Sequence, residues 1–195
     1  MKARKSLGYI LILVFMYGIF IACALANTPI KNTEFPNQLS LGGQTWTLGY
    51  NDEDANTHLG EYVTNGENVN NWTQLVTLQK FKFMFPKDMT PAMFAEKEME
   101  PLTKNPNYKF TFHIIEANAQ EAIMEFNVEK PLSEQQDEIQ RIIKTADDRL
   151  IILHYVIKKL DMGKEARDTW ISALKSIKLP FINEATNTNS TNTNK

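Results

Sequence analysis

Histidines with nearby carboxylates are the residues of this sequence that could perform acid–base chemistry. The chain contains His58, His113 and His154. A histidine acts as a base or a metal ligand only where partner groups converge on it. His113 and His154 could meet across a sheet, with Glu116 or Glu125 nearby. No spacing signature supports such a site, so we expect each histidine to be a partly buried, hydrogen-bonded side chain.

A second candidate is a calcium loop in an acidic stretch. Asp52, Asp54 and Asn56 follow the spacing of oxygen ligands that opens an EF-hand loop. The pattern then fails, because Thr57 replaces the glycine and Val63 replaces the bidentate glutamate. We therefore expect a solvated turn and no metal. Further ligands within reach would be His58 and Glu61.

Methionines are a third candidate, because four of them lie within sixteen residues. Met-rich exported segments sometimes hold Cu(I). Phenylalanines interleave with these methionines, and two of them fit the apolar stripe of a helix, so core packing is the expected role. We predict no cofactor. The four residues are Met84, Met89, Met93 and Met99.

Aromatic residues of the first three expected strands could form a binding face. These are Trp46, Tyr50, Tyr62 and Trp72. Aromatic side chains dominate recognition surfaces, but they also dominate cores. They are the binding residues that the sequence suggests, and Trp72 is expected to be packed in either case.

The first 26 residues read as an export signal. A charged start with Lys2 precedes an apolar run over 7–21, and Ala24-Leu25-Ala26 is typical of a signal-peptidase site. We expect cleavage before Asn27. The alternative is lipidation, because Phe20-Ile21-Ala22-Cys23 resembles a bacterial lipobox with Phe20 in place of the preferred leucine.

Composition excludes several classes of function. The chain has 21 basic and 23 acidic residues, and removal of the three cations in the signal leaves a net charge of −5. No basic stripe is present, which argues against nucleic acid as a partner. Cys23 is the only cysteine, so the mature chain has no disulfide and no thiolate chemistry. The sequence also lacks a nucleophile elbow, a His-Glu-x-x-His motif, a phosphate loop and a dinucleotide fingerprint.

Hydrophobic periodicity predicts an α+β fold. Residues 150–157 are apolar on both faces, which is typical of a central strand covered on both sides. We expect a single twisted antiparallel sheet of about seven strands with two packed helices, joined mostly by hairpins. The expected strands are 44–50, 59–64, 72–83, 109–116, 122–128 and two runs within 139–159, and the helices are 91–103 and 164–177.

The domain layout follows from these elements. After the signal peptide, 1–26, residues 27–43 read as an extended lead-in and 44–182 as one α+β domain. Residues 183–195 are rich in Asn and Thr and cannot bury an apolar face, so we expect a disordered tail.

Several segments carry a resemblance to a known family. The segments 71–77 and 138–144, the pair His154-Tyr155 and the pattern Arg167-x-x-Trp170 resemble small uncharacterised exported proteins of gammaproteobacteria. The similarity covers about 45–179. The order of strands and the terminal amphipathic helix are also similar to the PsbP-like family, which implies an α/β/α sandwich used by extrinsic binding subunits. The resemblance implies no activity.

The leading hypothesis is an exported, non-enzymatic binding protein, periplasmic or secreted. Its partner would be an unknown protein or envelope component, bound through a sheet face or an edge strand, and a secreted virulence-associated factor is one version of it. One alternative is a small hydrolase or metal-dependent enzyme that uses His113 or His154. Another is an envelope lipoprotein anchored through Cys23. No transmembrane segment is expected after signal cleavage.

Overall fold

The computed structural model describes residues 35–177. The predicted signal peptide, Cys23 and the predicted tail at 183–195 lie outside the described residues. No helix within residues 35–177 is long and apolar enough to cross a membrane.

The described chain forms eight strands, two α-helices and one short 3-10 helix. The helices are α2 (Pro91–Thr103), α3 (Lys164–Ser176) and the 3-10 helix η2 (Leu132–Glu134). The strands are β1 (Gln38–Leu41), β2 (Gln44–Glu53), β3 (Thr57–Val63), β4 (Gln74–Phe81), β5 (Lys109–Ala117), β6 (Glu121–Lys130), β7 (Gln136–Lys144) and β8 (Leu150–Ile157).

All eight strands form one antiparallel sheet in the order β1-β2-β3-β4-β8-β7-β6-β5. The predicted α+β class is confirmed, with eight strands in place of the seven expected. The additional strand is β1, inside the segment predicted as a lead-in. Its four residues are too few for a clear periodicity, and its order comes from pairing with β2 and from the burial of Leu39 and Leu41. Likewise β2 continues to Glu53, so Asp52 lies in a strand and not in a loop.

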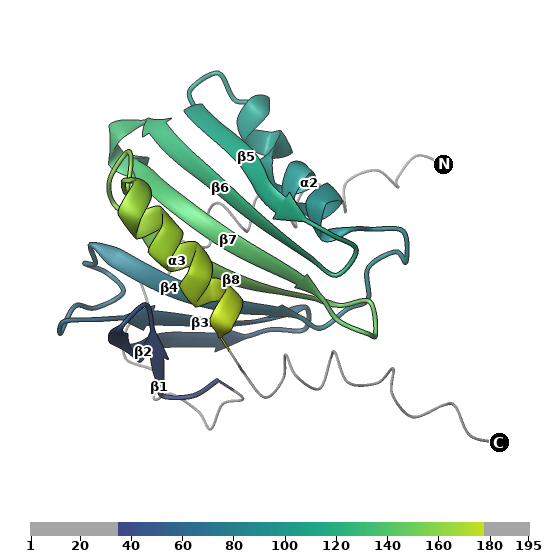
Figure 1. Ribbon diagram of the computed structural model, residues 1–195, viewed down its shortest axis with the longest axis horizontal. Coiled ribbons are helices and arrows are strands. Elements are labelled where there is room, and N and C mark those ends of the chain that lie inside the picture. Colours follow the sequence, from purple (N-terminus) through teal and green to yellow (C-terminus); the bar gives the residue numbers. More distant parts are fainter. Residues whose placement is uncertain (1–34, 178–195) are drawn as a thin grey trace, which may run out of the picture.

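The two helices cover opposite faces of the sheet, as Figure 1 shows with α3 in front of the strands and α2 behind them. Alternation along β8 explains why both faces need a core. Ile151, Leu153 and Tyr155 pack in the same cluster as residues of α3, whereas Leu150 and Ile152 pack with residues of α2. The described chain is therefore a three-layer arrangement, helix on sheet on helix.

Aromatic stacking fixes α3 to its face. Trp170 stacks on Tyr155 with ring centroids 3.5 Å apart and an interplanar angle of 12°, and Trp46 meets Trp170 edge-on. The same indole lies over the β1–β2 turn, where a Cβ on Gly42 would come within 2.7 Å of the Trp170 ring. Gly42 and Gly43 both have positive φ, as a two-residue hairpin turn requires.

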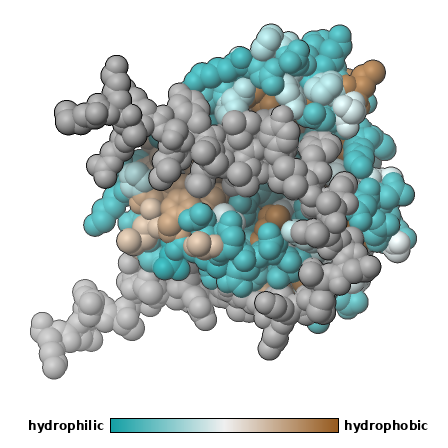
Figure 2. Space-filling model, turned by 180° about the vertical axis from the view of Figure 1, so that it is seen from behind, coloured by the Kyte–Doolittle hydropathy of each residue, from teal (hydrophilic) through white to brown (hydrophobic). Residues whose placement is uncertain are grey.

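Helix α2 begins as the sequence predicts. Thr90 Oγ1 accepts a hydrogen bond from the Met93 N–H at 3.1 Å, and Pro91 occupies the first helical position. The buried side of the helix, including Ala95 and Met99, packs on β5, β6 and β7. Figure 2 shows the molecule from this side, with apolar side chains exposed among hydrophilic ones.

Substitution of the two turn glycines tests the packing of Trp170. Gly43→Ala should cost only the strain of a positive φ, about 1–2 kcal/mol, because no atom lies within 4 Å of the position that its Cβ would take. Gly42→Ala should cost about 1–3 kcal/mol more, because the added methyl displaces the buried indole. Urea denaturation followed by tryptophan fluorescence measures both, and equal losses would contradict this account.

Candidate functional site

A row of polar side chains crosses the middle of the face covered by α2. Strand register places Glu61 opposite Thr77, Thr77 opposite His154, and His154 opposite Gln140, on β3, β4, β8 and β7. All four side chains are buried. Buried polar groups cost free energy unless they are hydrogen-bonded, so the hydrogen bonds of this row decide how much its burial costs.

Glu138 is a hydrogen-bond acceptor beside this row, two residues before Gln140 on β7. Its Oε1 lies 2.6 Å from His154 Nδ1 and accepts from Gln140 Nε2 at 3.0 Å. Its Oε2 accepts from Gln136 Nε2 at 3.2 Å. Helix α2 adds the buried Glu98, which shares a side-chain hydrogen bond with Gln140. We call His154, Glu138, Gln140, Glu98 and Glu61 the His154 cluster.

Three buried atoms of the His154 cluster have no hydrogen-bond partner among residues 35–177: His154 Nε2, Gln140 Oε1 and Glu98 Oε2. Each comes from a different element, β8, β7 and α2. An unpaired buried polar atom costs about 1–3 kcal/mol. The hydrogen-bonding capacity of the cluster is thus only partly used. The free-energy cost of burying the cluster depends on which of its groups carry a proton.

Burial and mutual interactions shift the pKa values of groups in the His154 cluster. Burial raises the pKa of Glu98 to about 7, with Glu138 adding to the rise and His154 and Gln140 opposing it. Burial likewise raises the pKa of Glu61 to about 7 against the opposing charge of His154. Burial lowers the pKa of His154, but the hydrogen bond to Glu138 and the surrounding carboxylates outweigh it, so this pKa is raised.

His113 belongs to a different network on the opposite face. Its Nε2 lies 3.4 Å from Glu125, whose other oxygen pairs with Arg167 Nε of α3 at 2.5 Å. Arg167 also binds Asp161 at 3.0 Å. Burial raises the pKa of the neighbouring Asp137 to about 6, opposed by a hydrogen bond from the Met162 N–H. His113 and His154 therefore do not meet, because the sheet separates them, although each lies beside a carboxylate.

The acidic stretch around Asp54 is a hydrogen-bonded turn. Asp54 Oδ1 accepts from the N–H groups of Asn56 and Thr57 at 2.7 and 2.6 Å, and Asp52 Oδ1 accepts from the Glu53 N–H. His58 stacks on Phe35 and lies 2.9 Å from Asn51 Oδ1, while Glu61 points to the other face of β3. Within residues 35–177 no group of three or more His, Cys, Asp or Glu side chains could hold a metal ion.

The four aromatic candidates do not share an exposed face. Trp46 and Tyr62 are fully buried, Trp72 is buried beneath the Lys158 ammonium, and Tyr50 is half-buried. Tyr62 Oη donates to the Pro36 carbonyl at 2.9 Å. Three of these side chains therefore serve apolar cores: Trp46 and Tyr62 pack in the core beneath α3, and Trp72 packs in a separate cluster with Val63, Leu75 and Val156.

The methionine candidates are also divided between core and surface. Met89 and Met99 are buried, whereas Met84 is 70% exposed and Met93 is exposed at the start of α2. Phe81, Phe85 and Phe94 pack edge-on between these segments. Met89 and Met99 therefore have the expected packing role, whereas Met93 does not lie on the buried stripe of α2 as expected and Met84 is on the surface.

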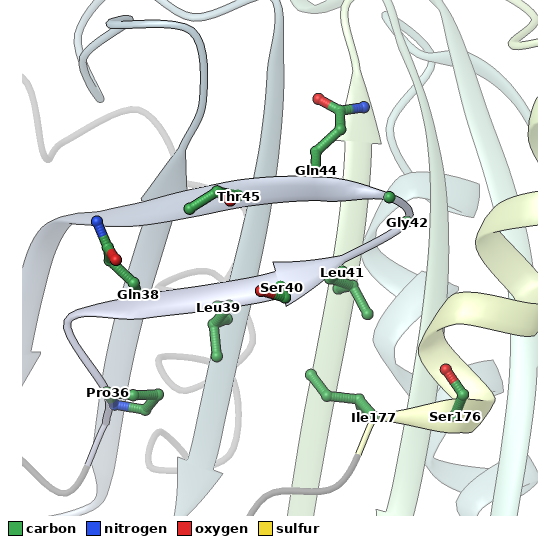
Figure 3. A pocket seen from close by; sticks show the side chains of 11 residues that line it. Pro36, Gln38, Leu39, Ser40, Leu41, Gly42, Gln44, Thr45, Ser176 and Ile177 are labelled. Atoms are coloured by element: carbon green, nitrogen blue, oxygen red, sulfur yellow. The ribbon is translucent and has the colours of Figure 1, made fainter.

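An open cleft lies between the β1–β2 hairpin and the carboxyl end of α3. Its volume is about 710 Å³. In Figure 3, Leu39 and Leu41 extend from β1 toward the side on which Ile177 lies. The cleft is lined by Pro36, Gln38, Leu39, Ser40, Leu41, Gly42, Gly43, Gln44, Thr45, Ser176 and Ile177.

Little in the sequence signals this cleft. None of its lining residues is charged or a histidine, so no chemical motif marks it. Its two walls lie about 130 residues apart in the chain, and only the fold brings Ser176 and Ile177 to β1. The Gly42-Gly43 turn is the one local feature that indicates a hairpin here.

Comparison with known proteins adds a family. A protein-family model matches residues 33–189, which include every residue that the structure describes. The chain belongs to this uncharacterised family. A search of curated proteins gave no match.

The His154 cluster predicts a stability that falls as the pH rises from about 5 to 8.5. In this window the folded chain keeps protons on Glu98, Glu61 and His154 that the unfolded chain releases, because all three pKa values are raised on folding. Glu98→Gln keeps a neutral, hydrogen-bonding side chain but removes one titration. The variant should therefore lose less stability over this window than the wild type, by about 2–3 kcal/mol.

Urea denaturation at pH 5.5, 7 and 8.5 measures this difference. Glu96→Gln is the matched control, because Glu96 lies exposed on the same helix. Identical pH profiles for Glu98→Gln and the wild type would contradict the assignment of Glu98 to a buried, protonated carboxyl.

Proposed function

We propose that this chain is an exported, non-enzymatic binding protein, periplasmic or secreted, whose ligand occupies the cleft between β1 and α3. One observation carries the proposal: the cleft is lined by uncharged groups, whereas the shortest His–carboxylate contact described, His154 to Glu138, is buried beneath α2. The concave surface and the acid–base groups lie in different places.

The chemistry of the lining supports binding. Its hydroxyl groups come from Ser40, Thr45 and Ser176, and no histidine or carboxylate lines the cleft to activate them. Its remaining polar groups are the amides of Gln38 and Gln44 and main-chain atoms. Such groups orient a ligand through hydrogen bonds, as in binding sites with a few placed polar groups on an apolar wall.

The N-terminal sequence supports export. The charged start, the apolar run and the Ala24-Leu25-Ala26 site are those of a cleavable signal peptide. The resemblance to small exported proteins of gammaproteobacteria and the three-layer arrangement, which suits a PsbP-like fold, favour the same view. A secreted virulence-associated factor is one form of this proposal, and an envelope lipoprotein anchored through Cys23 is the form that lipidation would give.

A hydrolase that uses His154 is the second candidate. The 2.6 Å contact between His154 Nδ1 and Glu138, together with the unpartnered His154 Nε2, is the arrangement of an oriented general base. Substrate would reach this base only if α2 moved from the sheet. The cleft needs no such movement, and the binding proposal is therefore preferred.

Export can be tested on the native protein. Intact mass and N-terminal sequencing of fractionated cells should give a soluble species that begins at Asn27. A membrane-bound species that begins at a lipid-modified Cys23 would replace the free form with the lipoprotein. A species that retains Met1 in the cytoplasm would contradict export.

Ligand binding in the cleft can be tested by nuclear magnetic resonance. An uncharged fragment library of amides and alcohols should shift the amide signals of residues 38–45 and 176–177. Ser40→Phe should abolish these shifts by filling the cleft, whereas Thr47→Phe, on an exposed position outside the lining, should retain them. Fragments that gather at His154 and Glu138 instead would favour the hydrolase.

A further inference from the structure

The outer edge of β1 presents to the cleft main-chain groups that pair with no strand of the described part of the chain. β1 is the terminal strand of the sheet, and no strand within residues 35–177 pairs with its outer edge. The Leu48 N–H donates to the Asn37 carbonyl at 2.9 Å, so Asn37, Leu39 and Leu41 take the positions bonded to β2. By alternation, the main-chain groups of Gln38 and Ser40 point away from β2.

This edge is held in place before any partner binds. Trp46 Nε1 donates to the Leu41 carbonyl at 3.0 Å, and the Trp170 indole lies against Gly42 in the turn. Leu39 and Leu41 are buried in the core of the α3 face. A strand that is already ordered loses little conformational entropy on binding, which favours its use as a template.

The opposite edge of the sheet is protected in ways that β1 is not. β5 carries register shifts between Lys109 and Phe110 and between Ile114 and Glu116. It also bears the exposed polar side chains of Lys109, His113 and Glu116. Bulges and charges are the common means by which edge strands avoid pairing. β1 has neither, since its sequence is Gln-Leu-Ser-Leu and its pairing with β2 is regular.

The polarity of the cleft indicates what kind of strand would fit. No charged side chain lines it, so a charged ligand would lose hydration without gaining a counter-ion. Leu39 and Leu41 turn their side chains into the core and present only a small exposed fraction, 6% and 4%, to the cleft. Ile177 offers apolar contact on one side, and Gln38, Ser40 and Gln44 offer hydrogen bonds. An uncharged segment with alternating side chains matches both.

We propose that β1 accepts an extended, uncharged peptide segment of a partner protein as an added strand lying in the cleft. This inference rests on the proposed function and names the ligand class of the same site. Main-chain hydrogen bonds to Gln38 and Ser40 would supply affinity, and alternate side chains that enter the cleft would supply selectivity.

The test compares two substitutions at Ser40 in the full exported chain. A displayed library of uncharged octapeptides is selected against the wild type, and the selected peptides are synthesised for titration. Ser40→Pro removes an outward N–H and leaves the ladder to β2 intact, so peptide affinity should fall at least tenfold. Ser40→Ala keeps this N–H and removes only the side-chain hydroxyl, so its peptide affinity should stay at least threefold above that of Ser40→Pro. Circular dichroism and denaturation confirm that both variants are folded.

The outcomes separate this inference from the proposed function. Unchanged peptide affinity in Ser40→Pro would overturn strand addition. Fragments that bind in the cleft when no peptide can be selected would overturn it as well. In both cases the proposal that the cleft binds a ligand would still hold. Absence of both fragment and peptide binding would overturn the two together. A synthetic peptide of residues 183–195 and a concentration series of the protein are included. Preferential binding of that peptide, or dimerisation lost in Ser40→Pro, would assign the edge to this chain itself and overturn a foreign partner.

Discussion

The packing of β8 between two helical layers is the constraint on which the rest of the structure depends. β8 pairs with β4 on one side and β7 on the other, so it joins the two halves of the sheet. Its side chains alternate between the α3 core and the α2 core. Neither face of a strand in this position is exposed to solvent. A polar side chain among its eight residues therefore costs free energy unless it is hydrogen-bonded. His154 is the polar residue that breaks this pattern, and the His154 cluster forms around it.

The two faces of the sheet are covered by cores of different chemical character. On the α3 face, stacked rings of Trp46, Tyr155 and Trp170 make a dry core that also fixes the β1–β2 turn. On the α2 face, apolar residues flank a polar row, and burial raises the pKa values of Glu61 in this row and of Glu98 on α2. The first face sets the geometry of the open cleft, and the second couples the docking of α2 to protonation. The rigid aromatic core and the titratable His154 cluster thus lie on opposite faces of one sheet.

This division bears on how the molecule could act. Perturbed pKa values often mark functional sites, but they also arise in buried networks that only hold a structure together. Here the perturbed groups of the His154 cluster are buried under a helix, while the cleft beside β1 is lined by no titratable group. The cleft adjoins an ordered strand whose outer edge is paired with no strand of residues 35–177, which is suited to recognition.

The sequence by itself determined the elements, because local periodicity and capping are readable from neighbouring residues. The two apolar faces of β8, the bounds of α2 and the amphipathic helix α3 were each predicted, and so was the α+β class. Register and layer were decided only by the tertiary structure. Whether His113 and His154 meet depends on which face of the sheet each side chain lies on. That face is determined by strand pairing between residues far apart in the sequence. The same holds for β1, which is a strand only because β2 lies beside it, and for the cleft, whose walls meet only when α3 packs on the sheet.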